Sequence, residues 1–408
     1  MNPAPNKPTA ATIWNRSFIC VIAANLLLCV GHFSVNTLVA TYATFLGAAP
    51  VTMGLLTGMF FGIALAIRPI SGPMITKIDN RMLLIGVFAL GGIVNIGYAL
   101  FHSIPFFVAF RFLNGIQYSF VGSLIMTLAA DSLPPEKLAS GLGIYGVGGA
   151  VGTAFAPAIA DRVFMLGEGF GGQDMGFTFV FLFAAAALSL AVIPSVIMRP
   201  VRKTREEIAG TGAWYKNIIT VYAFPTTLVM FFVVIGSSII NSYVFNFGKE
   251  QNIGNISLFY TFMACTLIIS RPLSGWLSDR FGVAKIIIPG LVIFAASFVI
   301  VGTSKTLAQA VVGAIVAALG VGSSQPAIQA MNMQTVTPLK RSVASNTIYV
   351  GMDLGLFVGP LLGSVVYEHS SFAFMFQMTA VPVLAALVCF IIILPVYNRR
   401  RRELESCG

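Results

Sequence analysis

Charged side chains are scarce in this sequence. Asp, Glu, Lys and Arg together make up 9% of its 408 residues, whereas hydrophobic residues make up 57%. Soluble globular proteins carry about 25% charged residues. A chain with so little charge cannot cover a water-facing surface. The composition therefore excludes a soluble globular protein and favours one that lies in a lipid bilayer.

Histidine and cysteine are also rare. The three histidines, His32, His102 and His369, lie far apart in the chain. The five cysteines are too few and too scattered for a disulfide framework, so we expect free thiols. The sequence also lacks metal-ligand spacings, phosphate loops and nucleophile elbows. It therefore predicts no enzyme activity, no metal and no cofactor.

Acidic residues are the rarer charge, with 14 Asp and Glu against 24 Lys and Arg. An excess of bases can indicate nucleic-acid binding, but here the bases gather in short segments between apolar runs. Bases in such segments set the orientation of membrane helices. We therefore expect the lipid bilayer as a partner and no nucleic acid.

Long apolar runs are what the chain has instead. A helix needs about 20 mostly apolar residues to cross a bilayer. The sequence therefore predicts an all-α membrane protein of twelve transmembrane helices. The expected spans are 17–45, 53–75, 82–102, 106–130, 140–165, 176–198, 217–247, 257–277, 286–304, 307–335, 343–367 and 372–397.

The basic residues predict the orientation of these spans. An even number of spans places both termini on one side, and 18 of the 24 bases lie on that side. The opposite side holds only Arg162, Lys249 and Lys305. Because Lys and Arg are retained in the cytoplasm, we expect a multi-pass protein of the cytoplasmic (inner) membrane with both termini cytoplasmic.

One stretch of the chain appears twice. Residues 271–282 read RPLSGWLSDRFG, and residues 68–72 read RPISG, an offset of 203 positions. The same offset aligns Gly148 with Gly351 and Pro157 with Pro360. A constant offset through separate regions indicates an internal duplication of about half the chain.

The segment from Gly275 to Lys285 resembles the loop signature of the major facilitator superfamily of transporters, G-x-x-x-D-R-x-G-R/K-R/K. The resemblance covers essentially the whole chain. It implies two six-helix halves, 1–198 and 217–408, joined by a cytoplasmic linker at 199–216. It also implies that the first, fourth, seventh and tenth helices surround a central cavity.

The signature predicts a conformational latch at the cytoplasmic ends of the helices. Gly275 permits close approach of two backbones, Gly282 permits a sharp reversal, and Asp279 is placed to hydrogen-bond a neighbouring helix N-terminus. In the first copy Thr76 replaces the acid, and Asp79 is expected to take over part of its role. The latch candidates are Arg68, Gly72, Asp79, Arg271, Gly275, Asp279, Arg280 and Gly282.

Two charged residues lie inside spans. Arg111 and Gly115 resemble the superfamily's fourth-helix signature, R-x-x-x-G, whose arginine is tied to proton movement or to an anionic substrate. The alternative is an arginine that extends to the outer membrane surface. Asp353 is the only acid deep in a span, and burial favours the neutral form of a carboxyl group. The proton-coupling candidates are Asp353, His32 and Arg111; the alternative for Asp353 is a structural hydrogen bond.

The fifth and eleventh spans are rich in glycine. Small residues at spacing four, in 148–156 and again in 351–359, let helices touch closely. The first set resembles part of a signature of exporters, and generic helix packing is the alternative. We expect Asp353 to lie beside a glycine-rich face that moves against the other half.

Polar residues align on the four spans that the resemblance places around the cavity. Any one of them can instead be an interhelical hydrogen bond. The substrate-site candidates are Asn25, His32, Asn36, Arg111, Asn114, Gln117, Tyr118, Asn241, Tyr243, Asn246, Gln325, Gln329 and Asn332.

These features favour a monomeric secondary transporter that works by alternating access and couples export of a small organic molecule to protons. One alternative is an importer or exchanger of a small organic anion, with Arg111 at the carboxylate. Another class is a membrane sensor that does not transport.

The orientation is testable by single-cysteine labelling in intact cells. Because the bases lie on the side of the termini, Cys407 and a cysteine at Gly210 should react only with a reagent that reaches the cytoplasm. A cysteine at Gly171 should react from outside. Outside labelling of the first two positions would contradict the orientation.

Overall fold

The computed structural model describes residues 12–198 and 213–406, so most of the predicted linker, Gly210 and Cys407 lie outside the described residues. The described chain is helical and contains no strand. The first half contains α1 (Arg16–Phe45), α2 (Pro50–Lys77), α3 (Asn80–Leu100), α4 (Ile104–Asp131), α5 (Leu138–Leu190) and α6 (Val192–Ile197). The second contains α8 (Phe224–Glu250), α9 (Leu258–Phe281), α10 (Val283–Gly302), α11 (Leu307–Gln334), α12 (Arg341–Glu368) and α13 (Phe372–Ser406).

Twelve crossings are confirmed. Ten described helical segments are long and apolar enough to span a membrane. One of them, Pro135–Ile197, contains two predicted spans, because α5 is interrupted at Gly171 and at Gly172, whose φ is +76°. Residues before and after this point lie side by side, so the chain reverses there. The 24-residue α9 is the remaining crossing.

Local signals explain where several helices begin. The side chain of Asn15 accepts a hydrogen bond from the amide of Phe18 at the start of α1, and Thr306 accepts from Gln309 at the start of α11. Such caps satisfy amide groups that have no partner within the helix. Pro105 and Pro225 stand in the first turns of α4 and α8, where a missing amide proton costs little.

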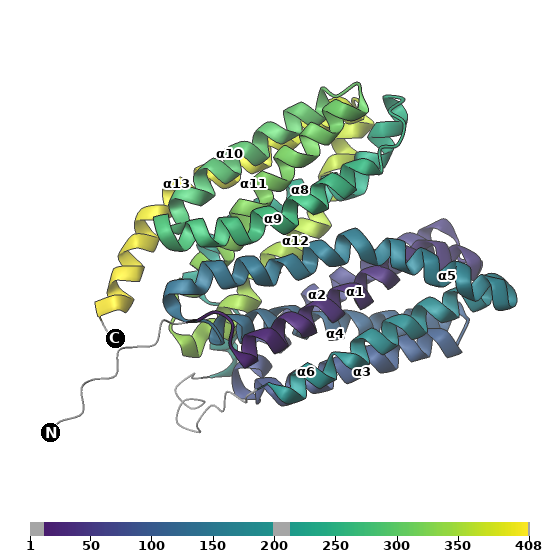
Figure 1. Cartoon of the computed structure of the whole chain (residues 1–408), viewed down its shortest axis with the longest axis horizontal. Helices are drawn as coiled ribbons and strands as arrows, with labels where there is room; N and C mark the ends of the chain where they lie inside the picture. Colours follow the sequence, from purple (N-terminus) through teal and green to yellow (C-terminus); the bar gives the residue numbers. More distant parts are fainter. Residues whose placement is uncertain (1–11, 199–212, 407–408) are drawn as a thin grey trace.

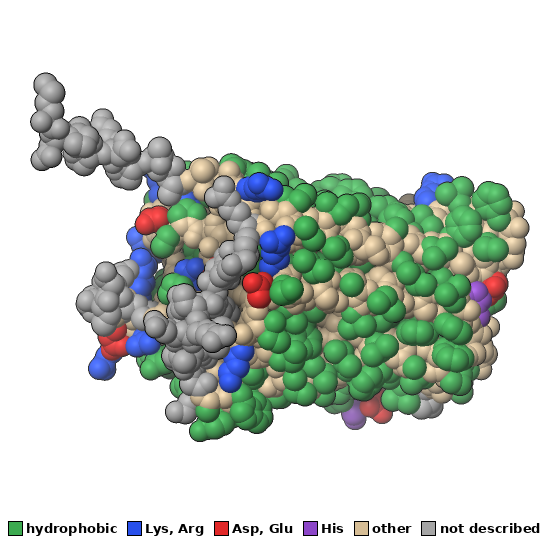
Figure 2. Space-filling view, turned by 90° about the horizontal axis from the view of Figure 1, so that it is seen from below, with side chains coloured by type: hydrophobic (Ala, Val, Ile, Leu, Met, Phe, Trp, Pro, Cys, Tyr) green, Lys and Arg blue, Asp and Glu red, His purple; other side chains and the backbone are tan. Residues whose placement is uncertain are grey.

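The helices form two bundles, one from each half (Figure 1). Between the bundles, α5 packs against α9 and α2 packs against α12. Figure 2 shows hydrophobic side chains over the middle of the visible face, with most of the visible Lys and Arg at one end. Exposed residues such as Ile269, Val388 and Ile392 contribute to this apolar surface. A surface of this kind suits lipid.

The regularly spaced glycines of α5 and α12 face helices of their own half. This corrects the expectation that the glycine-rich face of α12 moves against the other half. A Cβ at Gly152 of α5 would lie 2.5 Å from Cys29 on α1, and one at Gly355 of α12 would lie 2.8 Å from the Phe231 oxygen on α8. The glycines thus hold pairs of helices together within each half. Asp353 lies on another face of α12, against α2.

Closer contacts between the halves depend on the repeated signature. A Cβ at Gly275 would lie 2.4 Å from the carbonyl oxygen of Ala139 on α5. A Cβ at Gly72 would lie 2.6 Å from Asn346 on α12. The two equivalent glycines therefore let α9 and α2 each approach the opposite half.

We expect Gly275→Ala to destabilise the protein, because overpacking of this kind costs about 1–3 kcal/mol. Gly62→Ala is the matched control, since no atom lies within 4 Å of its added Cβ. The measurement is the thermal unfolding midpoint of each purified variant. Equal midpoints for the two variants would show that the contact is not tight.

Candidate functional site

A cavity of about 360 Å³ lies between the two halves. Helices α1, α2, α4 and α5 line one side of it, and α8, α9, α11 and α12 line the other. The substrate-site candidates that line it are Asn25, His32, Asn36, Tyr118, Asn241, Gln325 and Gln329. These seven come from all four helices that the resemblance placed around a central cavity.

The remaining candidates do not line this cavity, and this corrects the expectation for Arg111, Asn114, Gln117, Tyr243, Asn246 and Asn332. Asn332 is fully buried, accepts from the Thr226 hydroxyl at 2.7 Å and donates to the Ala344 oxygen at 2.9 Å. The Tyr243 hydroxyl donates to the Pro360 oxygen at 2.8 Å. These groups hold neighbouring helices together.

Arg111 is held by acceptors of its own half. Its Nε donates to the Leu56 oxygen at 3.0 Å, and its Nη1 donates to Oδ1 of Asn36 at 2.9 Å and of Asn114 at 3.4 Å. Its guanidinium also lies 4.8 Å from the centre of the Phe60 ring. With 2% of its surface exposed, Arg111 does not extend to the membrane surface. It positions Asn36, which does line the cavity.

His32 joins the cavity wall to the buried face of α4. Its Nε2 lies 2.9 Å from Oε1 of Gln117. The ring packs against Phe60 and Tyr118, which also line the cavity. The histidine therefore has one side toward the cavity and its polar contact behind it.

Asp353 forms a buried ion pair with Arg68 across the two halves. Nε of Arg68 lies 2.9 Å from Oδ2 of Asp353, and both side chains are 1% exposed. Arg68 also donates to the Ser119 oxygen at 2.5 Å and lies over the Tyr349 ring at 4.8 Å. Sequence reasoning singled out both charges but not their pairing, because they stand 285 positions apart.

The repeated signature makes different contacts in its two copies. The Asp279 carboxylate accepts from the amides of Ala139 at 3.0 Å and Ser140 at 2.8 Å, and also from the Ser140 hydroxyl. These groups form the N-terminus of α5, so the expected hydrogen bond is present. At the equivalent place Thr76 contacts the hydroxyl of Ser342 at 3.1 Å.

The role expected of Asp79 is wrong. Its carboxylate caps α3 of its own half and accepts from the amides of Arg81 at 2.9 Å and Met82 at 3.1 Å. A pair that the sequence did not indicate, Arg341 and Asp131 at 3.2 Å, joins the halves instead. Gly282 does end α9 with a φ of +92°, as the expected reversal requires.

Hydrogen bonds between the halves occupy one end of the molecule. In the described part of the chain they involve the last part of α2, α4 and α9 and the first part of α5 and α12, the end where α1 begins. We call this the closed end. The two bundles diverge toward the opposite end (Figure 1). Apart from the Arg271–Gly146 hydrogen bond in the cavity wall, the hydrogen bonds that join the halves in the described part of the chain thus lie at the closed end.

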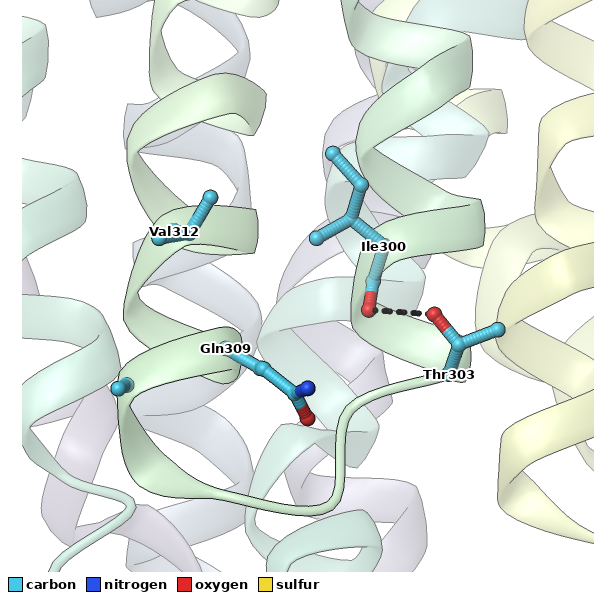
Figure 3. Close-up of a pocket in the computed structure, with 5 residues that line it drawn as sticks. Ile300, Thr303, Gln309 and Val312 are labelled. Carbon is cyan, nitrogen blue, oxygen red and sulfur yellow. Dashed lines mark hydrogen bonds between the residues drawn. The ribbon is translucent and has the colours of Figure 1, made fainter.

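A second hollow, of about 330 Å³, lies where α10 is followed by α11. Thr303, whose hydroxyl donates to the Ile300 oxygen at 3.2 Å, and Gln309 supply its polar groups (Figure 3). It belongs to one half and contains no predicted site residue. We assign it no function.

Comparison with known proteins gives a consistent family. The model of the Major Facilitator Superfamily matches residues 21–270 and 226–406. The multi-drug resistance efflux pump PmrA of Streptococcus pneumoniae is 25% identical over 326 residues, which are 76% of this chain and 78% of that protein. The putative multidrug resistance protein MdtD of Serratia proteamaculans is 23% identical over 144 residues, 35% of this chain and 30% of that protein. The chain thus matches less than a third of the MdtD length.

Solved structures resemble the whole fold. The Escherichia coli fucose:proton symporter FucP has a TM-score of 0.76 at 14% identity and covers 94% of this chain and 98% of its own. The human organic anion transporter MFSD10 has a TM-score of 0.75 at 14% identity, with 92% and 98% covered. At such identities the likeness establishes the twelve-helix fold alone.

We expect Asp279→Asn to loosen the closed end. The neutral amide loses the attraction of a carboxylate for the α5 N-terminus and its charge-assisted hydrogen bonds, worth about 1.5–3 kcal/mol. The measurement is the labelling rate of a cysteine at Ser345, which is buried between the halves, in a cysteine-free background. The rate should rise several-fold. Thr76→Asn should change it little; equal increases would mean that the two copies act alike.

Proposed function

The chain belongs to the major facilitator superfamily, and on that premise we propose that it is a monomeric secondary transporter that exports a small organic molecule in exchange for protons. It works in the cytoplasmic membrane with both termini inside. Its cavity, placed between two duplicated halves that are joined at one end and diverge at the other, supports alternating access by rocking. The similarity to multidrug efflux pumps supports export.

The Arg68–Asp353 pair carries the proposal of proton coupling. When the closed end opens, the two halves must separate and so must the pair. An isolated carboxylate in a low dielectric is costly, and protonation removes that cost. Asp353 is therefore proposed to be charged when the end is closed and neutral when it is open.

The orphaned atoms of the pair support such a cycle. Oδ1 of Asp353 and Nη2 of Arg68 are buried and have no hydrogen-bond partner among the described residues. A purely structural buried ion pair normally has all its polar atoms satisfied. Arg68 and Asp353 therefore use only part of their hydrogen-bonding capacity to hold the halves together. This suits a contact that forms and breaks in each cycle.

His32 is proposed as a secondary proton site. It lines the cavity and contacts Gln117, whose Nε2 is also buried without a partner among the described residues. Arg111 is a poor carrier because a guanidinium does not readily release its proton. Its bonds to its own half also leave it no access to the cavity.

We expect Asp353→Asn to abolish accumulation driven by a pH gradient while leaving downhill exchange, because the amide cannot take up or release the proton. The measurement is uptake into proteoliposomes of a compound that the wild-type protein accumulates in a screen of small organic molecules. His32→Gln should cause a smaller loss.

Asp161→Asn, which alters an exposed acid, is the matched control and should behave as wild type. If Asp353→Asn still concentrates the compound when only a pH gradient is supplied, Asp353 is structural and the coupling assignment is wrong.

A further inference from the structure

The cavity contains one fixed charge. Among the described residues that line it, Arg271 is the only Lys or Arg, and none is Asp or Glu. The other polar side chains, which include Asn25, Gln325 and Gln329, are mostly neutral. A cavity with an uncompensated cation and no fixed anion favours an anionic occupant.

The internal duplication shows what Arg271 lacks. With the offset of 203, Arg271 is the repeat equivalent of Arg68, and Asp353 is the repeat equivalent of Ala150. The first arginine has its carboxylate at 2.9 Å across the halves. Arg271 faces the first half, which has only the methyl group of Ala150 at the position equivalent to Asp353. Ala150 itself lines the cavity.

The partners that Arg271 does have are neutral. Its Nη1 donates to the backbone oxygen of Gly146, and its Nη2 donates to Oε1 of Gln325 at 3.0 Å. Its Nε has no hydrogen-bond partner among the described residues. Oxygen atoms of amides satisfy hydrogen bonds without cancelling the charge, so the guanidinium remains without a counterion.

The absence of a side chain at Gly146 leaves space for the Arg271 guanidinium. A Cβ at Gly146 would lie 2.9 Å from Nη1 of Arg271. The Nε2 amide of Gln325 makes no hydrogen bond within the described part of the chain, so it can donate to a ligand beside the guanidinium. Together the two side chains offer the planar set of donors that a carboxylate accepts best.

We propose that the cavity binds an amphipathic organic monoanion, with its carboxylate at Arg271 and its apolar body against the aromatic rings of Phe33, Phe61 and Tyr260. The anion occupies the place of the acid that the first half lacks, where Ala150 is equivalent to Asp353. This inference rests on the proposed function, since it names the substrate class of the same cavity. A single cation favours one negative charge over two.

The test uses the full-length purified protein and two sets of probes with the same skeleton but different charge. One set is phenylacetate, phenylacetamide and phenethylamine; the other is naphthylacetate, naphthylacetamide and naphthylethylamine. Binding is measured as the shift of the thermal unfolding midpoint with ligand concentration. In at least one set the carboxylate should bind about tenfold or more tightly than its amide, as expected for a charge-assisted hydrogen bond, and the amine should bind most weakly.

Variants assign this preference to Arg271. Arg271→Gln should remove the preference for carboxylate over amide, and Arg271→Lys should retain part of it. Arg162→Gln, which removes an exposed cation away from the cavity, is the matched control and should keep the wild-type order. Size-exclusion profiles and unliganded midpoints establish that each variant is folded.

Three results would overturn the inference: equal binding of carboxylate and amide, an unchanged preference in Arg271→Gln, or no midpoint shift with any carboxylate. Uptake into proteoliposomes separates this failure from failure of the proposed function. Accumulation of neutral or cationic compounds alone would leave proton-coupled transport standing and reject the anion site. Carboxylate binding that depends on Arg271, without any accumulation driven by a pH gradient, would keep the site and reject the function.

Discussion

The buried ion pair between Arg68 and Asp353 is the constraint on which the rest of the arrangement depends. Two opposite charges at 1% exposure are tolerable only while they remain together, because separation leaves each of them buried and unpaired. One charge belongs to each half. Any motion that separates the halves at the closed end must therefore stabilise both charges in another way. Water can solvate them, a new partner can pair with them, or a proton can neutralise the carboxylate.

The surrounding contacts belong to the same interface. Asp279 binds the N-terminus of α5 from one side, and Arg341 reaches Asp131 from the other. Gly72 and Gly275 let the helices approach closely enough for these bonds to form. None of these residues extends the contact toward the opposite end, so the halves can remain joined here while the cavity stays accessible from elsewhere.

Duplication gave the halves one architecture and different chemistry. The closed end uses Asp279 where the first copy has Thr76, and a carboxylate at Asp353 where the first copy has Ala150. A fully symmetric protein would hold two equivalent ion pairs. Among the described residues, Arg68 has a carboxylate partner at the interface, whereas Arg271 has none in the cavity, so the two signature arginines differ in their electrostatic surroundings.

The fold was predictable from local features, whereas the site was only partly so. Apolar runs of about 20 residues and the constant offset identify twelve spans and two halves, because lipid imposes length and hydrophobicity on each helix separately. The two apolar runs within α5 are separate spans because the chain reverses between them, at Gly172 with its positive φ. Seven candidate polar residues do line the cavity.

The failures come from two things that spacing along a helix does not determine: how deep the cavity reaches and which neighbouring helix each side chain meets. Asn332 lies on the same helix as Gln325, and since seven residues are nearly two full turns its side chain points in almost the same direction. It lies about 10 Å further along the helix, however, where Thr226 of α8 and Ala344 of α12 are its hydrogen-bond partners. Spacing cannot tell which polar face meets a neighbour and which meets the cavity. Nor can it pair Arg68 with Asp353, because that contact exists only once the halves are docked.

Tyr349 provides the physical link between the ion pair and the cavity. Its ring lies 4.8 Å beneath the Arg68 guanidinium, and the same residue lines the cavity, as does Met352 beside Asp353 in the chain. In the proposed function, a ligand that fills the cavity would change the packing and hydration around this ring, and so the free energy needed to separate Arg68 from Asp353. In the proposed cycle, substrate and proton therefore need no direct contact to influence one another, because both would act on the stability of this one ion pair.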